Sequence, residues 1–392
     1  MGDRETEFSN SAKLPSIATL RKAIPSHCFV PSWSRSFFYL FRNVISCLIL
    51  GFAALHIPLI ESNSARLACW MAYGILQGLV CTGLWILGHE CGHNAFSTSH
   101  WINAGTGWLI HSALLVPFFS WRLTHSRHHR YTGHMTKDTA FVPYRDDELE
   151  SMRHGQWTWW LFEDTPVSST LLLVTRQLLG WPLYFFFYSS AGSDTLQRSG
   201  QRRWWRMSHF DPTAMIYQPR DAGAVLLSDI GLLLAVIAIY RWVLISGSSV
   251  VFLTYGIPYL WVNHWMVTIT YLQHTHPSVP RYEEGTWTFR RGALCTIDRD
   301  TGILGTYFFH RVMETHLVHH FFPKIPFYYA DEATKAIAPL LGDHYRRETT
   351  PLIPSLWRTF RACQAVGSLG STSESTPGIL HWNTAPHARL QS

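Results

Sequence analysis

VISCLILGFAALHIPLI at residues 44–60 is followed by the short polar turn ESNSAR and by ACWMAYGILQGLVCTGLWILG at residues 68–88. A helix needs roughly 20 mainly apolar residues to cross the hydrocarbon core of a bilayer, and both runs approach that length. They predict a membrane hairpin. Residues 222–240 and 250–272, joined around SGSS, predict a second one. The sequence therefore favours an all-α integral membrane protein with four transmembrane helices in two hairpins.

The composition agrees with a membrane protein. Only 15% of the residues are charged, whereas a soluble globular domain carries about 25%. The 18 Trp, 16 Tyr and 23 Phe suit membrane–water interfaces, where aromatic rings lie at headgroup depth. The net charge of +6 fits loops that face an anionic cytoplasmic leaflet. No segment resembles a nucleic-acid-binding module, and the seven cysteines include no C-x-x-C pair.

Two weaker apolar segments and the termini complete the predicted layout. Residues 107–119 are too short to span, and residues 171–188 contain Arg176, Gln177 and Pro182, so we place both at the interface. Basic clusters follow both segments, which predicts cytosolic loops there. We expect a cytosolic N-terminal segment at 1–36, a membrane-bound domain at 37–363, and a disordered tail at 364–392 that is rich in Ser, Thr, Gly and Pro.

Histidines form three clusters among the 22 in the chain. Their spacings are i and i+4, or i, i+3 and i+4, and residues three and four apart share one face of a helix. Imidazole is the commonest metal-binding side chain. The predicted topology brings all clusters to the cytosolic side if residues 171–188 do not cross, which predicts a histidine-rich cap for two metal ions. The clusters are His89 and His93; His125, His128 and His129; His316, His319 and His320.

Two other classes of function fit single features of this pattern. His89, Glu90 and His93 match the H-E-x-x-H signature of zinc proteases. A protease would bind one zinc with three protein ligands, fewer than the eight clustered histidines, and would remain active after His319→Ala. A metal transporter would carry its ligands within the spans, whereas these clusters flank them.

Several further motifs resemble those of one enzyme family, the membrane-bound fatty acid desaturases, and specifically the delta-12 (omega-6) oleate desaturases and their divergent relatives. The resemblance covers roughly 320 residues in order. It is carried, besides the histidine clusters, by KAIPSHCF at 22–29, HSALLVPFFSW at 111–121, SDIG at 228–231, YLQHTHP at 271–277, RGALCTIDRD at 291–300 and DEATKAI at 331–337.

The resemblance implies two iron ions held by the eight clustered histidines and a ninth ligand. His274 matches that ninth position best, and His276 is the second choice. Glu90 and Glu314 are expected to orient imidazole rings or to lie on a solvated face. Four more histidines lie outside the helical spacings and are expected to support the ligands from outside the site or to have structural roles: His111, His134, His264 and His310.

The family chemistry implied is insertion of a cis double bond into an acyl chain, with O₂ as co-substrate. Neither a G-x-G-x-x-G fingerprint nor a haem-binding C-x-x-C-H or H-P-G-G motif is present. Electrons are therefore expected from cytochrome b5 and its NADH-dependent reductase. The implied substrate is a C18 acyl chain on phospholipid, and the implied location is the endoplasmic reticulum membrane with a cytosol-facing site.

Two residues depart from the ordinary oleate desaturase pattern. Gly88 stands where those enzymes carry Ala, and Asn94 stands where His or Gln is usual. Both lie beside predicted ligands, and about 1.4 kcal/mol between competing barriers changes a product ratio tenfold. A delta-12 acetylenase, or a conjugase, epoxygenase or hydroxylase acting on linoleoyl chains, is therefore the alternative to the desaturase.

Overall fold

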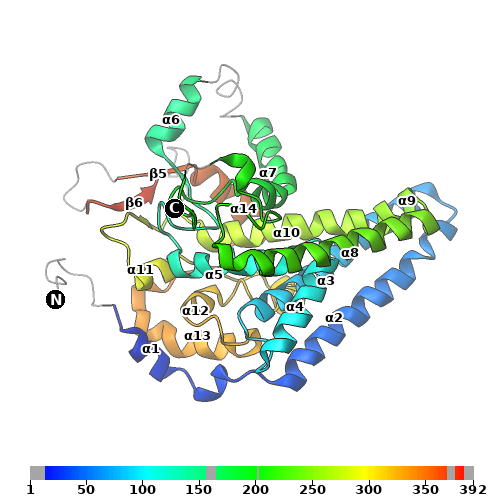
Figure 1. Cartoon of the computed structure of the whole chain (residues 1–392), viewed down its shortest axis with the longest axis horizontal. Coiled ribbons are helices and arrows are strands. Elements are labelled where there is room, and N and C mark those ends of the chain that lie inside the picture. Colours follow the sequence, from blue (N-terminus) through cyan, green and yellow to red (C-terminus); the bar gives the residue numbers. More distant parts are fainter. Residues whose placement is uncertain (1–13, 156–164, 201–202, 369–375, 384–392) are drawn as a thin grey trace.

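Four long helical segments lie side by side and project from the rest of the protein in the computed structural model (Figure 1). The structure describes residues 14–155, 165–200, 203–368 and 376–383. Helix α2 (Trp33–Ala54) leads to α3 (Asn63–Gly92) through η2 (Ile57–Leu59). Helix α8 (Ala222–Ser246) is followed by α9 (Ser248–Val251), η5 (Phe252–Gly256) and α10 (Ile257–His274). These are the two hairpins that the apolar runs predict.

Local sequence explains where the first hairpin begins and turns. Ser32 and Ser62 cap α2 and α3, because each side chain accepts a hydrogen bond from the backbone N–H three residues later. Between the helices, Pro58 and the polar turn residues interrupt the apolar run. Helix α3 then continues for 30 residues without a break and ends at the first histidine cluster.

Apolar segments long enough to cross a membrane agree only in part with the predicted spans. By length and composition they are Trp33–Leu59, Asn63–Gly92, Pro166–Phe187 and Pro219–Ser246, with a fifth if α4 and α5 form one bent span. Two of them contain the predicted runs 68–88 and 222–240, and Trp33–Leu59 covers all but the last residue of the predicted run 44–60. The predicted run 250–272 lies in α9, η5 and α10, and α10 carries Asn263, His264 and Gln273. The four-span topology stays a prediction.

Helix α7 (Pro166–Phe187) contains nearly all of the segment 171–188 expected at the interface and is long and apolar enough to cross a membrane, so its placement at the interface stays a prediction. It is a single helix of 22 residues, because Thr165 caps its start and the interior Pro182 does not end it. The other expected interfacial segment, 107–119, falls across α4 (His100–Ala113) and α5 (Phe118–Tyr131), which meet at 107°. This bend directs α5 and its histidines away from the axis of α4.

Short elements form the end opposite the projecting helices. They include a four-stranded sheet of order β1-β5-β6-β2, with β1 and β5 parallel and the other pairs antiparallel, and the two-stranded parallel sheet β3-β4. The strands are β1 (Tyr144–Arg145), β2 (Arg281–Tyr282), β3 (Asp298–Arg299), β4 (Arg347–Glu348), β5 (Ala365–Gly367) and β6 (Ile379–Trp382). The helices are α1 (Ile17–Ala23), η1 (Ser26–Phe29), α6 (Asp146–Gly155), η3 (Trp204–Arg206), η4 (Pro219–Asp221), α11 (Phe289–Ala293), η6 (Leu304–Phe308), α12 (His316–Phe321), α13 (Phe327–Leu341), η7 (Gly342–His344) and α14 (Leu352–Ala362).

The sheet corrects two expectations, because the fold is mostly helical rather than all-α and residues 364–392 are not uniformly disordered. Strands β5 and β6 pair with each other and with β1 and β2. Leu380 and Trp382 are buried in a cluster with Met135. The free energy gained by burying Leu380 and Trp382 stabilises β6 although the segment around it is polar in composition. Residues 369–375 and 384–392 of the expected tail lie outside the described residues.

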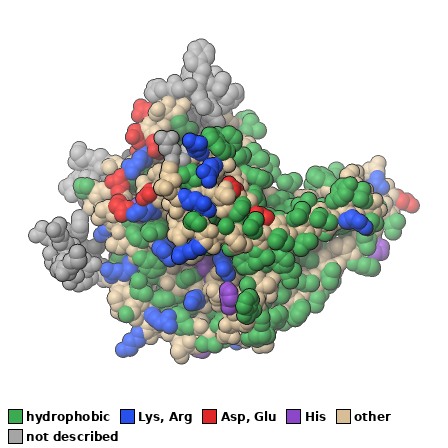
Figure 2. Space-filling model, in the orientation of Figure 1, with side chains coloured by type: hydrophobic (Ala, Val, Ile, Leu, Met, Phe, Trp, Pro, Cys, Tyr) green, Lys and Arg blue, Asp and Glu red, His purple; other side chains and the backbone are tan. Residues whose placement is uncertain are grey.

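Hydrophobic side chains cover the projecting helices, whereas charged side chains gather at the opposite end (Figure 2). A soluble monomer rarely exposes a continuous apolar patch larger than a few hundred Å². This distribution is that of a membrane protein. Exposed apolar residues on α2 and α8 include Phe38, Leu48, Ile49, Phe52, Leu233, Leu234 and Leu244.

Candidate metal centre

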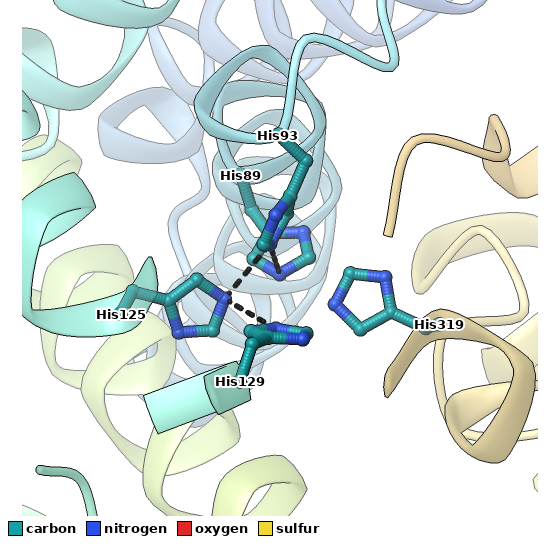
Figure 3. A group of neighbouring side chains, drawn as sticks. All are labelled: His89, His93, His125, His129 and His319. Carbon is teal, nitrogen blue, oxygen red and sulfur yellow. Dashed lines mark hydrogen bonds between the residues drawn. The ribbon is translucent and has the colours of Figure 1, made fainter. Parts of the chain in front are cut away.

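Five histidines from three helices point into one space (Figure 3). Their nearest nitrogens all lie within 4.8 Å of one another. The facing Nε2 atoms are 3.2 Å apart between His89 and His93, 3.0 Å between His93 and His125, and 3.1 Å between His125 and His129. Helix α12 contributes His319. We call His89, His93, His125, His129 and His319 the five-histidine group.

Four more histidines form a second group beside the first. His274 Nε2, at the end of α10, lies 3.2 Å from His128 Nε2 and 3.0 Å from His316 Nε2. His320 Nε2 lies 3.0 Å from His316 Nε2. The stacked rings of His129 and His320, with centroids 4.2 Å apart, join the two groups. We call His128, His274, His316 and His320 the four-histidine group.

Helical spacing explains how adjacent residues serve different groups. His125 and His129 are four residues apart on α5 and share a face, whereas His128 points to the second group. Helix α12 likewise contributes to both groups: His319 belongs to the five-histidine group, and His316 and His320 belong to the four-histidine group. Two short helical segments therefore supply six of the nine imidazoles.

The donor set fits bound metal ions. Burial lowers the pKa of His125, His129, His316 and His320 well below the usual value, and lowers that of His319 to about 3. The rings are therefore neutral, as metal ligands must be. His319 Nε2 is buried and has no hydrogen-bond partner among the described residues. A cation at the shared centre would satisfy this nitrogen and the run of facing Nε2 atoms.

Outer contacts hold the four-histidine group in place. His128 Nδ1 donates to Asp138 Oδ1 at 2.7 Å, and His274 Nδ1 donates to the Cys295 carbonyl at 3.3 Å. Thr132 Oγ1 lies 3.1 Å from His320 Nδ1. Such contacts fix the tautomer and orientation of a ligating ring. No spacing in the sequence predicts these partners, because they lie in loops outside the clusters.

The hydrogen bond between His128 and Asp138 is the shortest of these outer contacts. The carboxylate is 1% exposed and also accepts hydrogen bonds from the backbone N–H of Gly133 and of Ala140, both at 3.0 Å. Burial alone would raise its pKa, but the interaction with the His128 ring and the hydrogen bond from the Ala140 N–H outweigh burial and hold the pKa of Asp138 below its usual value. Asp138 therefore stays ionised at neutral pH.

The two glutamates expected beside the ligands make other contacts. Glu90 Oε1 lies 3.4 Å from His89 Nδ1, but its Oε2 accepts a hydrogen bond from the Phe327 N–H. Glu90 thus links the end of α3 to the start of α13. Glu314 accepts hydrogen bonds from the backbone and hydroxyl of Thr301. These hydrogen bonds hold the loop that contains Thr301 and do not orient an imidazole ring.

The other five histidines considered from the sequence lie outside both groups. His276 Nε2 donates to Glu348 at 3.2 Å, so geometry favours His274 as the ninth member. His111 Nε2 donates to the Trp85 carbonyl at 3.0 Å. His134 contacts Glu284, His310 contacts Asn43, and His264 packs between Trp261 and Trp265. These positions agree with the structural roles expected for these four residues.

A cavity of about 790 Å³ connects the histidines to the surface. His89, His125, His128, His274 and His316 line it on one side. Apolar and aromatic residues of α7 and α10 form much of the wall, among them Leu179, Trp181, Tyr184, Met266 and Ile269. The exposed side includes Arg145, Glu148 and Arg176. The volume is within the range of about 300–1,000 Å³ typical of small-molecule sites.

Comparison with known proteins identifies similar sequences over most of the chain. A family model described as fatty acid desaturase matches residues 66–351. The chain is 43% identical to an oleate hydroxylase of Claviceps purpurea, with 94% of this chain and 80% of that protein covered. It is 40% identical to a delta(12) fatty acid desaturase of Mortierella isabellina, covering 93% and 91% respectively. It is also 40% identical to an omega-6 fatty acid desaturase, endoplasmic reticulum, of Brassica juncea, covering 88% and 86%.

Proposed function

Because the chain belongs to the fatty acid desaturase family and is an oxidoreductase, we propose that it introduces a cis double bond at the delta-12 position of oleoyl lipids. One observation carries the proposal. Nine imidazoles, seven of them buried and those of His93 and His125 half-buried, form two adjacent groups that open into a largely apolar cavity. A relative named delta(12) fatty acid desaturase, similar over 93% of this chain, supports the regiochemistry.

The proposed ligands of two iron ions are the five-histidine and four-histidine groups. Bound iron with O₂ supplies an oxidant strong enough to take hydrogen from an unactivated methylene, which no side chain provides. The protein residues orient and enclose the reactants. Asp138 and the Cys295 carbonyl hold the rings of His128 and His274, and the walls of α7 and α10 exclude water from the acyl chain.

The partners and location follow from the same assignment. The acyl chain is a C18 chain carried by a membrane lipid, and cytochrome b5 with its NADH-dependent reductase supplies electrons. A relative named for the endoplasmic reticulum supports that membrane as the location. The site then faces the cytosol, where this donor pair is available. The catalytic unit extends from residue 37 beyond the expected boundary at 363, because β5 and β6 pair with strands near the site.

The second candidate function is a different oxidation of the acyl chain, such as hydroxylation, epoxidation or formation of a triple or conjugated bond. Two observations support it. One relative with 43% identity is named an oleate hydroxylase. A Cβ at Gly88 would lie 2.3 Å from His111 Cδ2, so the glycine permits a close approach beside the ligand His89. Asn94, beside His93, adopts φ 57°, a left-handed conformation that Asn tolerates better than most residues.

Product analysis in a host that makes oleate but no polyunsaturated acids tests both candidates. Total fatty acids are measured by gas chromatography and mass spectrometry, with linoleate supplied to a parallel culture. New linoleate in the first culture supports delta-12 desaturation. A hydroxylated product there, or an alkynyl, conjugated or oxygenated product only in the second culture, supports the divergent candidate. Purified protein containing zinc without iron would contradict both.

A further inference from the structure

Arg176 is an unusual residue because it carries a charge within an apolar helix. It is the single Asp, Glu, Lys or Arg residue among the 22 residues of α7. The side chain is exposed and lines the cavity that leads to the histidines. Charged residues in such helices are costly, and they commonly mark a substrate or ion pathway. We therefore ask which anionic ligand the Arg176 side chain binds at the cavity.

No carboxylate in the part of the chain that the structure describes neutralises the charge of Arg176. Among the residues that the structure describes, no acidic group lies within 4.0 Å of its guanidinium, which instead lies 5.1 Å from the centroid of Phe360 on α14. Arg145, the other arginine of the lining, pairs with Glu283 at 2.7 Å. The acidic residue of the lining, Glu148, accepts a hydrogen bond from the Arg145 backbone. Within the described part of the chain, Arg176 is thus the arginine of the cavity lining that no carboxylate pairs with.

Neighbouring elements have the character of a membrane interface. Helix α14 buries Leu356 and Phe360 but exposes Ile353, Arg358 and Arg361. An amphipathic helix with exposed basic residues suits the headgroup region. Beyond the end of α7, Trp204 and Trp205 are 65% and 57% exposed, as expected for rings at headgroup depth. Arg176 therefore lies where the polar part of a lipid would meet the cavity.

We propose that Arg176 binds the phosphate of the acyl carrier while the acyl chain occupies the cavity. The inference rests on the proposed function. A guanidinium can donate two parallel hydrogen bonds to phosphate oxygens, which makes arginine the preferred residue for this anion. Holding the phosphate fixes the carboxyl end of the chain. Arg176 thereby helps to determine which methylene reaches the two histidine groups.

Equilibrium binding by the purified iron-loaded protein tests the inference without turnover. The probes are dioleoylphosphatidylcholine, oleoyl coenzyme A and dioleoylglycerol, which lacks phosphate, each followed by tryptophan fluorescence because Trp181 lines the cavity. The variants are Arg176→Gln and Arg176→Lys. The control is Arg241→Gln, which removes an exposed arginine from the apolar helix α8. Iron content and thermal unfolding establish that each variant is folded.

We expect Arg176→Gln to weaken binding of at least one phosphate-bearing probe by about tenfold, as for loss of a charge-assisted hydrogen bond. Binding of dioleoylglycerol and the behaviour of Arg241→Gln should not change, and Arg176→Lys should retain part of the affinity. Loss for phosphatidylcholine alone identifies a phospholipid carrier, and loss for oleoyl coenzyme A alone identifies a thioester carrier.

Equal weakening of all three probes, or no weakening of either phosphate-bearing probe, would overturn the inference. Failure of the proposed function looks different. In that case the host cultures show no delta-12 product, although the difference between phosphate-bearing and phosphate-free probes persists in the binding measurement.

Discussion

Replacement of Asp138 by Asn tests whether the four-histidine group holds a metal ion. The carboxylate accepts three hydrogen bonds, from His128 Nδ1 at 2.7 Å and from two backbone N–H groups at 3.0 Å. An amide has one oxygen, so its NH₂ group must face at least one of these donors. An unsatisfied buried donor costs about 1–3 kcal/mol, and the negative charge beside His128 is also lost.

The expected result is selective loss of iron from one of the two sites. Loss of an outer partner typically lowers metal affinity 10–100-fold, which corresponds to about 1.4–2.8 kcal/mol. Wild-type and Asp138→Asn proteins are titrated with a chelator, and iron per chain is measured by mass spectrometry. We expect one iron to leave the variant at a 10–100-fold lower chelator concentration while the other is retained. The five-histidine group has no contact with Asp138.

A matched control separates this effect from a general loss of charge. Asp300 pairs with Arg347 at 3.2 Å, and both side chains are about half exposed. Such surface pairs contribute about 0–1 kcal/mol, so Asp300→Asn should retain both irons. Identical chelator titrations for Asp138→Asn and wild type would refute the reasoning, because they would show that His128 does not depend on its carboxylate.

Three further changes address single side chains. His274→Ala should remove one iron per chain whereas His276→Ala should retain both, as measured by elemental analysis; the reverse would exclude His274 as a ligand. Gly88→Ala should lower the midpoint of thermal unfolding, because a Cβ 2.3 Å from His111 costs about 1–3 kcal/mol of overpacking against about 1 kcal/mol of helix propensity gained. An unchanged or higher midpoint would show that His111 moves freely. Burial raises the pKa of Asp298 to about 7, so the folded state binds the proton more tightly and the free energy of unfolding should fall as pH rises from about 4 to 7. Chemical unfolding at several pH values checks this slope, which Asp298→Asn should reduce; an equal slope in the variant would assign it to other groups.

The sequence predicted which histidines share a helix face because that information is local. Spacings of three and four residues place imidazoles on one face of α5 or α12, whatever the rest of the chain does. The apolar run 68–88 also predicts a helix where α3 (Asn63–Gly92) lies. Assigning His128 to a different group from His129 required the positions of α10 and α12, since only the assembled helices show which partners each ring meets.

Other features depend on contacts between distant segments. Asp138 follows the second cluster in a loop without periodicity, and its role appears only because Gly133, Ala140 and His128 surround it. Strand β6 lies in a polar segment whose composition predicts disorder, yet Trp382 packs in a buried cluster with Met135. Helix α10 is less apolar than a typical span because one face lies inside the protein, where Gln273 and His274 are buried.

The pairing of β5 and β6 with β1 and β2 has a consequence for the order of synthesis. Cys363 and Gln364, which line the cavity, immediately precede β5, and β6 follows every helix that carries a proposed ligand. Domains fold during translation as their residues leave the ribosome. A nascent chain with all nine histidines already made would still lack this part of the wall. The proposed acyl site is therefore completed late in biogenesis, after all nine proposed metal ligands have been synthesised.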